Sequence, residues 1–260
     1  MPKLAITGKG GVGKTTLAAL LAHSYQQEGN KVLLIDADPD ANLASALGLP
    51  ESLSKQITPI SEMDDLIEER TGARPGSFGG MFSLNPKVDD IPDRFSATHR
   101  GIKLLVLGTI GRGGGGCICP ESSLLKNLVR HLFVGRSEVV ILDMEAGLEH
   151  LGRGTAGAVD AFIVVVEPGQ RSVQTAGAVK RLAADIGIHR VFIVGNKIRE
   201  ASDRNFVLDH FSQEEVLGFL PFSEKAIAAD MQGLAIFDAD EQLVRAAREI
   251  RERLAVGSEE

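Results

Sequence analysis

The chain has 260 residues, of which 43% are hydrophobic and 24% are charged, and its net charge is −7. This length suits one large α/β domain, and the composition is that of a packed globular protein, which excludes disorder as the main state. A non-specific nucleic-acid binder usually carries the opposite charge, because phosphate neutralisation supplies most of its affinity. We therefore expect a single domain over residues 1–260 that does not bind nucleic acid.

The apolar segments and the cysteine count indicate the compartment in which the protein works. No apolar run approaches the roughly 20 residues that a membrane span needs. The opening segment, Lys3 to Thr7, has the character of a strand that runs into a glycine loop rather than of a signal peptide. Only two cysteines are present, which excludes a disulfide framework. We expect a cytoplasmic protein without membrane contact.

Short apolar runs alternate with stretches of helical periodicity along the chain. The apolar runs predict strands over Leu4–Thr7, Val32–Asp36, Ile102–Leu107, Val139–Asp143, Ala161–Val166, Val191–Asn196 and Val216–Leu220. Helices are expected over Lys14–Glu28, Ser122–Phe133, Ser172–Ile186, Ala201–Phe211 and Asp238–Leu254. This alternation predicts an α/β fold with a mostly parallel twisted sheet flanked by helices. Pro75–His99 interrupts the pattern and is expected to be an irregular surface excursion, and Gly108–Pro120 is a second, glycine-rich interruption.

The first expected strand runs directly into a glycine-rich motif. The segment is Gly8-Lys9-Gly10-Gly11-Val12-Gly13-Lys14-Thr15-Thr16, and it matches G-x-x-x-x-G-K-[ST]. Between a strand and a helix, the N–H groups of such a loop curl around phosphates and the helix N-terminus faces them. The whole segment is therefore predicted to bind ATP or ADP. Lys14 should bridge the β- and γ-phosphates, Thr15 should bind Mg²⁺ and Thr16 should contact the α-phosphate.

Lys9, just after the first glycine, marks the deviant form of this Walker A loop. In this respect the chain resembles the P-loop ATPases that include MinD, ParA and the nitrogenase iron protein. The resemblance implies that Lys9 crosses a two-fold homodimer interface and contacts the nucleotide of the partner subunit. A cation supplied in this way stabilises transition-state charge only once the dimer has closed.

Acidic residues stand at the ends of two further expected strands. Asp36 ends the second expected strand, Asp38 follows it, and Asp143 ends the fourth. The carboxyl ends of parallel strands meet at one edge of a sheet. We expect Asp143 to hold Mg²⁺ through water, with Asp36 as a further partner near the ion. Asp38 resembles the aspartate of this family that orients the attacking water. The resemblance also implies that Asn196 hydrogen-bonds adenine and that Pro221 lies near the ring.

The two cysteines form a C-x-C pair, Cys117-Ile118-Cys119, after a run of four glycines. Alternate residues of an extended segment point the same way, so two thiolates can converge on one metal ion. Two ligands leave a tetrahedral site incomplete, and a two-fold dimer supplies four. Thiolates favour soft or borderline metals such as Ni²⁺ and Zn²⁺. The same spacing is also compatible with free thiols that bind no metal.

Further stretches resemble the CooC-type ATPases that mature nickel-containing carbon monoxide dehydrogenase. They include Leu84-Asn85-Pro86-Lys87-Val88-Asp89 and Gly147-Leu148-Glu149-His150-Leu151, and the likeness runs from about Lys3 to Leu254. It implies an ATP-dependent metallochaperone, a homodimer that binds Ni²⁺ or Zn²⁺ through Cys117 and Cys119 of both chains and assists nickel insertion into that enzyme. The sibling ATPase that matures acetyl-CoA synthase shares most of these features. The sequence is also compatible with a MinD- or ParA-like positioning switch or with an electron donor like the nitrogenase iron protein.

Overall fold

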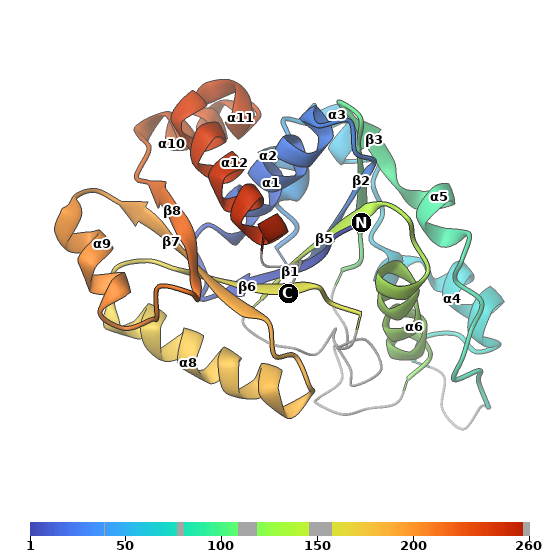
Figure 1. Ribbon diagram of the computed structural model, residues 1–260. Helices are drawn as coiled ribbons and strands as arrows, with labels where there is room; N and C mark the ends of the chain where they lie inside the picture. The colour runs from blue at the N-terminus through green and yellow to red at the C-terminus, as the bar shows by residue number, and fades with distance from the viewer. Residues whose placement is uncertain (39, 77–80, 109–118, 146–157, 257–260) are drawn as a thin grey trace.

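The computed structural model describes residues 1–38, 40–76, 81–108, 119–145 and 158–256. In this part of the chain, strands β1 to β8 form one sheet in the order β3-β4-β2-β5-β1-β6-β7-β8 (Figure 1). All neighbours are parallel except β3 and β4, which confirms the predicted mostly parallel sheet. The bounds are β1 Lys3–Gly8, β2 Val32–Ala37, β3 Ala97–His99, β4 Ile102–Val106, β5 Val139–Met144, β6 Ala161–Val166, β7 Val191–Ile198 and β8 Val216–Pro221.

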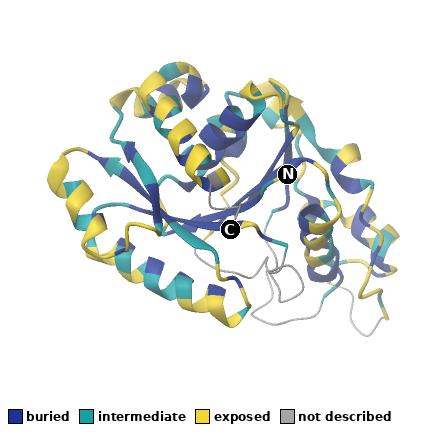
Figure 2. Ribbon diagram, in the orientation of Figure 1, coloured by how far each residue is buried: buried dark blue, intermediate teal, exposed yellow. Residues whose placement is uncertain are grey.

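The central strands β1, β2, β5 and β6 are buried along their whole length (Figure 2). Alternate residues enter two separate cores. In β5, Val139 and Ile141 pack into one core, whereas Val140 and Leu142 pack into the other. A parallel sheet with helices on both faces requires this two-sided burial. The uninterrupted Val, Ile and Leu runs of the sequence therefore lie at the centre of the molecule.

Helices cover both faces of the sheet. One core is closed by α1 Lys14–Gln27, α2 Leu43–Ala46, α11 Ile236–Ala239 and α12 Glu241–Val256. The other is closed by α4 Asp64–Thr71, α5 Ile91–Phe95, α6 Pro120–Val134, α8 Gln170–Asp185 and α9 Ala201–Leu208, with a 3-10 turn at Ile60–Glu62. Two further helices are α3 Glu51–Ser54 and α10 Glu224–Gln232. Fully buried leucines such as Leu17 and Leu128 each contribute roughly 1.5–3 kcal/mol to the hydrophobic stabilisation of these layers.

The expectation of an irregular surface excursion over Pro75–His99 is wrong for the last part of that segment. This part forms α5 and β3, and Ile91 is fully buried in the core. Pro92 stands in the first turn of α5, where its missing N–H has no helical partner to lose. Arg100 and Gly101, with φ of 51° and 78°, then turn the chain so that β3 pairs antiparallel with β4.

The expected closing helix over Asp238–Leu254 is in fact two helices, α11 and α12, divided at Asp240. Asp240 Oδ1 accepts a hydrogen bond of 2.9 Å from the Gln242 N–H, and Oδ2 accepts one of 2.5 Å from Ser223 Oγ. The carboxylate thereby caps the first turn of α12. The apolar stripe of α12, which includes Ile250, is buried against the sheet. Among the described helices, none has the length and apolarity needed to cross a bilayer.

Candidate nucleotide site

Glycines at two positions of the motif are required by conformation and by space. β1 ends at Gly8 and α1 begins at Lys14, and Gly8 and Gly13 have φ of 151° and 95°. A Cβ atom on Gly8 would lie 2.5 Å from the Val165 carbonyl oxygen, and one on Gly13 would lie 2.1 Å from Asn196 Nδ2. Only glycine combines this backbone conformation with so close an approach of neighbouring chain. The loop between β1 and α1 therefore has the geometry that its sequence motif predicts.

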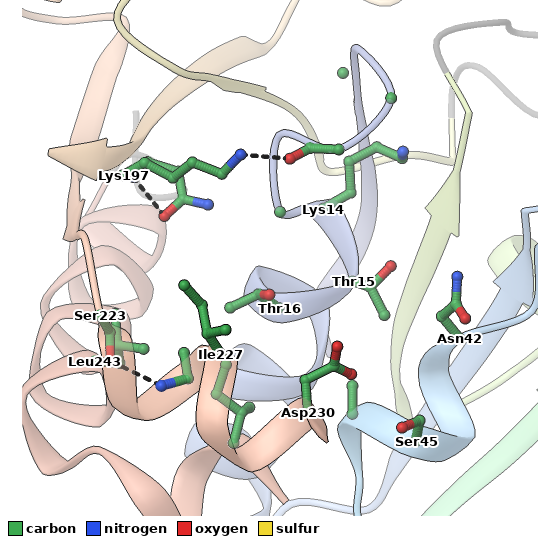
Figure 3. Close-up of a pocket in the computed structure, with 18 of the residues that line it drawn as sticks. Lys14, Thr15, Thr16, Asn42, Ser45, Lys197, Ser223, Ile227, Asp230 and Leu243 are labelled. Atoms are coloured by element: carbon green, nitrogen blue, oxygen red, sulfur yellow. Dashed lines mark hydrogen bonds between the residues drawn. The ribbon is translucent and has the colours of Figure 1, made fainter. Parts of the chain in front are cut away.

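A pocket of about 740 Å³ opens at this loop. The predicted residues that line it are Gly8, Gly10, Gly11, Gly13, Lys14, Thr15, Thr16, Asp38, Asn196 and Pro221. In Figure 3, Thr15 and Thr16 lie between Lys197 on one side and Asn42 on the other. The wall also includes Phe222, from the loop expected near the adenine ring, and Leu243 of α12. Residues to which the sequence assigned no role complete it: Asn42, Ser45, Lys197, Ser223, Ile227 and Asp230. A phosphate-binding loop facing a partly apolar wall suits a nucleotide with its base.

Four of the predicted residues are not part of the pocket lining: Lys9, Val12, Asp36 and Asp143. Val12 is fully buried in the core, so its side chain does not face the pocket. The Lys9 side chain is 38% exposed, and its Nζ lies 3.8 Å from Glu167 Oε1. Lys9 therefore stands beside its own pocket rather than inside it.

Asp143 and Thr15 meet at the predicted magnesium position. Thr15 Oγ1 donates a hydrogen bond of 2.7 Å to Asp143 Oδ2, whereas Asp143 Oδ1 is buried and has no hydrogen-bond partner within the described residues. Burial raises the pKa of Asp143 to about 6. A buried carboxylate oxygen without a donor, beside a threonine hydroxyl, fits the oxygen ligands that Mg²⁺ prefers. Bound here, Mg²⁺ would neutralise nucleotide phosphate charge and stabilise the ionised form of Asp143.

Asp36 pairs in register with Asp143 across β2 and β5, but both of its oxygens already serve the chain. Oδ1 accepts a hydrogen bond of 3.3 Å from the Asp38 N–H and Oδ2 one of 3.0 Å from the Leu43 N–H. Burial raises the pKa of Asp36 to about 7. In this structure Asp36 organises the turn from β2 to α2, while its part in magnesium binding stays a prediction.

Lys14 and Asp38 form an ion pair inside the pocket. Lys14 Nζ lies 3.3 Å from Asp38 Oδ2, and their side chains are only 8% and 14% exposed. The predicted phosphate-binding lysine and the predicted water-orienting carboxylate thus meet at one point. A nucleotide phosphate would compete with Asp38 for Lys14, because both are anions.

Asn196 and Pro221 reach the pocket from the ends of β7 and β8. Asn196 Nδ2 donates a hydrogen bond of 2.6 Å to the Val12 carbonyl, and Asn196 Oδ1 accepts one of 2.8 Å from the Lys197 N–H. Both polar ends of this amide are therefore engaged with protein, and its predicted contact with adenine is untested.

Only one of the two cysteines belongs to the described residues. Cys117 lies outside the described residues, and Cys119 is a half-buried free thiol immediately before α6. Within the described ranges, no cluster of three or more His, Cys, Asp and Glu side chains could hold a metal ion. The predicted ligation by Cys117 and Cys119 therefore stays a prediction.

Comparisons with known proteins agree with the fold and with the nucleotide site. The profile of the CobQ/CobB/MinD/ParA nucleotide binding domain matches residues 3–236. The carbon monoxide dehydrogenase accessory protein CooC of Rhodospirillum rubrum is 50% identical over 91% of this chain and 89% of its own length. An uncharacterised ATP-binding protein of Methanocaldococcus jannaschii is 48% identical over 90% of both chains.

Solved structures give the same fold. A chain of the MinC:MinD cell division protein complex of Aquifex aeolicus matches with a TM-score of 0.70 at 23% identity, covering 98% of this chain and 96% of that one. A putative plasmid partition protein of Borrelia burgdorferi bound to AMPPNP has a TM-score of 0.69 at 16% identity, covering 99% of this chain and all of that one. With the P-loop geometry and the profile match, these findings show that the chain is an ATPase of the MinD/ParA family of P-loop proteins and is similar to CooC.

Proposed function

We propose that the chain is an ATP-dependent metallochaperone that binds nickel or zinc between two subunits and assists nickel insertion into carbon monoxide dehydrogenase. The observation that carries this proposal is the 50% identity to CooC over 91% of the chain. The protein acts in the cytoplasm as a nucleotide-dependent homodimer. Cys117 and Cys119 of each chain supply four thiolates, which is a complete tetrahedral set for one ion.

The topology supports a link between metal and nucleotide. Cys119 precedes α6, and the connection from β4 to α6 leaves the carboxyl edge of a parallel sheet. The P-loop, Asp38 and Asp143 stand at the same edge. A partner subunit that approaches this edge to place its Lys9 on the nucleotide would therefore bring its own cysteine pair as well. In this way closure of the dimer and completion of the metal site become one event.

Lys9 and Asp38 divide the chemistry between the two subunits. Asp38 orients the attacking water beside Lys14, with which it already forms an ion pair. Lys9, which is half-buried and outside its own pocket lining, adds positive charge to the partner's nucleotide in the transition state. Hydrolysis then removes the γ-phosphate that holds the subunits together and resets the dimer.

Two alternatives remain: a different client enzyme, and a positioning ATPase in place of a metallochaperone. Acetyl-CoA synthase is the second candidate client, because its maturation ATPase shares most of the sequence features that resemble CooC. A positioning switch of the MinD type would use a free amphipathic helix on a membrane. The apolar stripe of α12 is instead buried, with Leu243 and Leu254 only 2% and 4% exposed, which favours the metallochaperone.

Activation of a nickel-free enzyme tests the proposal. Nickel-deficient carbon monoxide dehydrogenase is incubated under reducing, anaerobic conditions with Ni²⁺, ATP and the chain, and its activity is followed over time. We expect faster activation at limiting Ni²⁺ with the wild type, and no acceleration with Cys119→Ser or Lys14→Ala. Equal activation by wild type and Cys119→Ser would contradict the proposal. Nickel-free acetyl-CoA synthase in a parallel assay distinguishes the two clients.

A further inference from the structure

Lys197 follows Asn196 near the end of β7, and the sequence motifs assigned it no role. Its φ is 58°, in the left-handed region that residues with a Cβ atom rarely adopt. Among the described non-glycine residues, only Arg100 shares a positive φ. Such a conformation is unfavourable and persists where the surrounding contacts require it, often at functional sites.

The contacts of the Lys197 side chain lead to the P-loop. Its Nζ donates a hydrogen bond of 2.7 Å to the Gly11 carbonyl (Figure 3), and Asn196 Nδ2 donates one of 2.6 Å to the Val12 carbonyl. Two successive residues of β7 therefore hold two successive carbonyls of the P-loop. The Lys197 donor is charged, the Asn196 donor is buried, and their acceptors lie 186 and 184 residues away in the sequence.

Holding these carbonyls decides where the N–H groups of the loop point. The carbonyl and the N–H of one peptide unit point in opposite directions, because the unit is planar and trans. With the Val12 carbonyl turned toward β7, the Gly13 N–H is turned away from it. Phosphate-binding loops bind anions through such N–H groups. A loop whose carbonyls are fixed in advance binds phosphate without first having to order its main chain.

Glu167, which follows β6, keeps the Lys197 side chain in place. Its Oε2 accepts a hydrogen bond of 3.1 Å from Lys197 Nζ, and its Oε1 lies 3.8 Å from Lys9 Nζ. The same carboxylate thus contacts Lys197 of β7 and the half-buried Lys9 of the P-loop. The Glu167 side chain is 30% exposed, and its two oxygens face different lysines.

We infer that Lys197 is a positioning residue for nucleotide binding, which fixes the main chain of the P-loop in its phosphate-binding form with Glu167 as its support. This role requires neither the metal site nor dimerisation. It can therefore fail or hold independently of the proposed metallochaperone function.

Lys197→Gly is the first test, because glycine adopts a positive φ without strain and lacks the ammonium group. We expect the dissociation constant for Mg-ADP, measured by calorimetry on the metal-free protein, to rise about tenfold, the effect of one lost charge-assisted hydrogen bond. The KM for ATP should rise by a similar factor, while kcat at saturating ATP changes less than twofold. The melting temperature without nucleotide should not fall, since strain is removed together with the contact.

Lys197→Met and Arg100→Gly complete the design. Lys197→Met retains the aliphatic stem and the left-handed backbone but has no donor, so it should weaken Mg-ADP as Lys197→Gly does. Arg100→Gly makes the same exchange at the other left-handed position, outside the pocket lining, and should leave Mg-ADP affinity unchanged. Wild-type affinity in either Lys197 variant, or an equal loss in Arg100→Gly, would overturn the inference.

Discussion

Replacement of Gly13 by alanine tests the geometry of the nucleotide site at its tightest point. Gly13 has a φ of 95°, and an added Cβ would lie 2.1 Å from Asn196 Nδ2. The Asn196 side chain must move away, and its hydrogen bond of 2.6 Å to the Val12 carbonyl is then lost. The substitution therefore combines backbone strain with the loss of one buried hydrogen bond.

The backbone strain and the lost hydrogen bond each have a typical free-energy cost. A left-handed conformation costs a residue with a Cβ atom about 1 kcal/mol, and a typical buried hydrogen bond contributes about 1 kcal/mol. We therefore expect Gly13→Ala to lower the free energy of unfolding by about 2 kcal/mol. For a protein of this size, each kcal/mol shifts the melting temperature by roughly 2–4 °C, so the expected loss is about 4–8 °C.

Gly10 supplies the matched control within the same loop. A Cβ on Gly10 would meet no atom within 4 Å, and its φ is not positive. Thermal unfolding of wild type, Gly10→Ala and Gly13→Ala, followed by far-UV circular dichroism without nucleotide, makes the comparison. Gly10→Ala should melt within about 1 °C of wild type. Equal melting temperatures of the two variants would refute the assigned packing of Asn196 on the P-loop.

Three further outcomes are expected. Lys14→Ala should abolish detectable binding of a fluorescent ATP analogue, because it removes the buried lysine that lies beside Asp38 inside the pocket. Lys9→Ala should bind ATP normally but lose hydrolysis and ATP-dependent dimerisation in sedimentation velocity; wild-type turnover would contradict the contribution in trans. Burial raises the pKa of Asp143 from 3.8 to about 6, so the folded state holds this proton more tightly than the unfolded state. The stability that the protonated carboxyl contributes is fully present below about pH 4 and is lost as the pH rises through 6. Without Mg²⁺ and nucleotide, the unfolding free energy of wild type relative to Asp143→Asn should therefore decrease from pH 4.5 to 7, and an increase would contradict the assigned burial.

The fold could be predicted from sequence where the signal is local. Short β-branched apolar runs such as Val139–Asp143 favour buried strands, and the glycine motif defines both the turn after β1 and the start of α1. β3 was missed because three residues carry little pattern and are held in place by pairing with β4. The break at Asp240 was missed for a similar reason, since its cap depends on Ser223 from another segment.

The residues of the candidate site were likewise predictable where a local motif marks them and not where only the fold brings them together. Lys14, Thr15 and Asp38 line the pocket, because a short motif and a strand end place them there, while their roles in binding and catalysis stay predictions. Lys197 carries no signal in the sequence, since its contact with Gly11 spans 186 residues and exists only when β7 reaches the P-loop. The wall formed by α10 was likewise invisible, because its residues contribute through their place in the fold rather than through a motif. The cysteine pair was visible only as a motif, and its metal site stays a prediction.

Stoichiometric metal binding tests the central claim most directly. Anaerobic, reduced protein is titrated with Ni²⁺ and with Zn²⁺, with and without ATP, and the complexes are resolved by native mass spectrometry. The account predicts one metal ion for two chains, with a four-thiolate spectrum, and loss of the ion in Cys117→Ser and Cys119→Ser while both variants still bind nucleotide. No metal binding, or binding unaffected by these substitutions, would contradict the metallochaperone and leave a nucleotide switch with incidental cysteines.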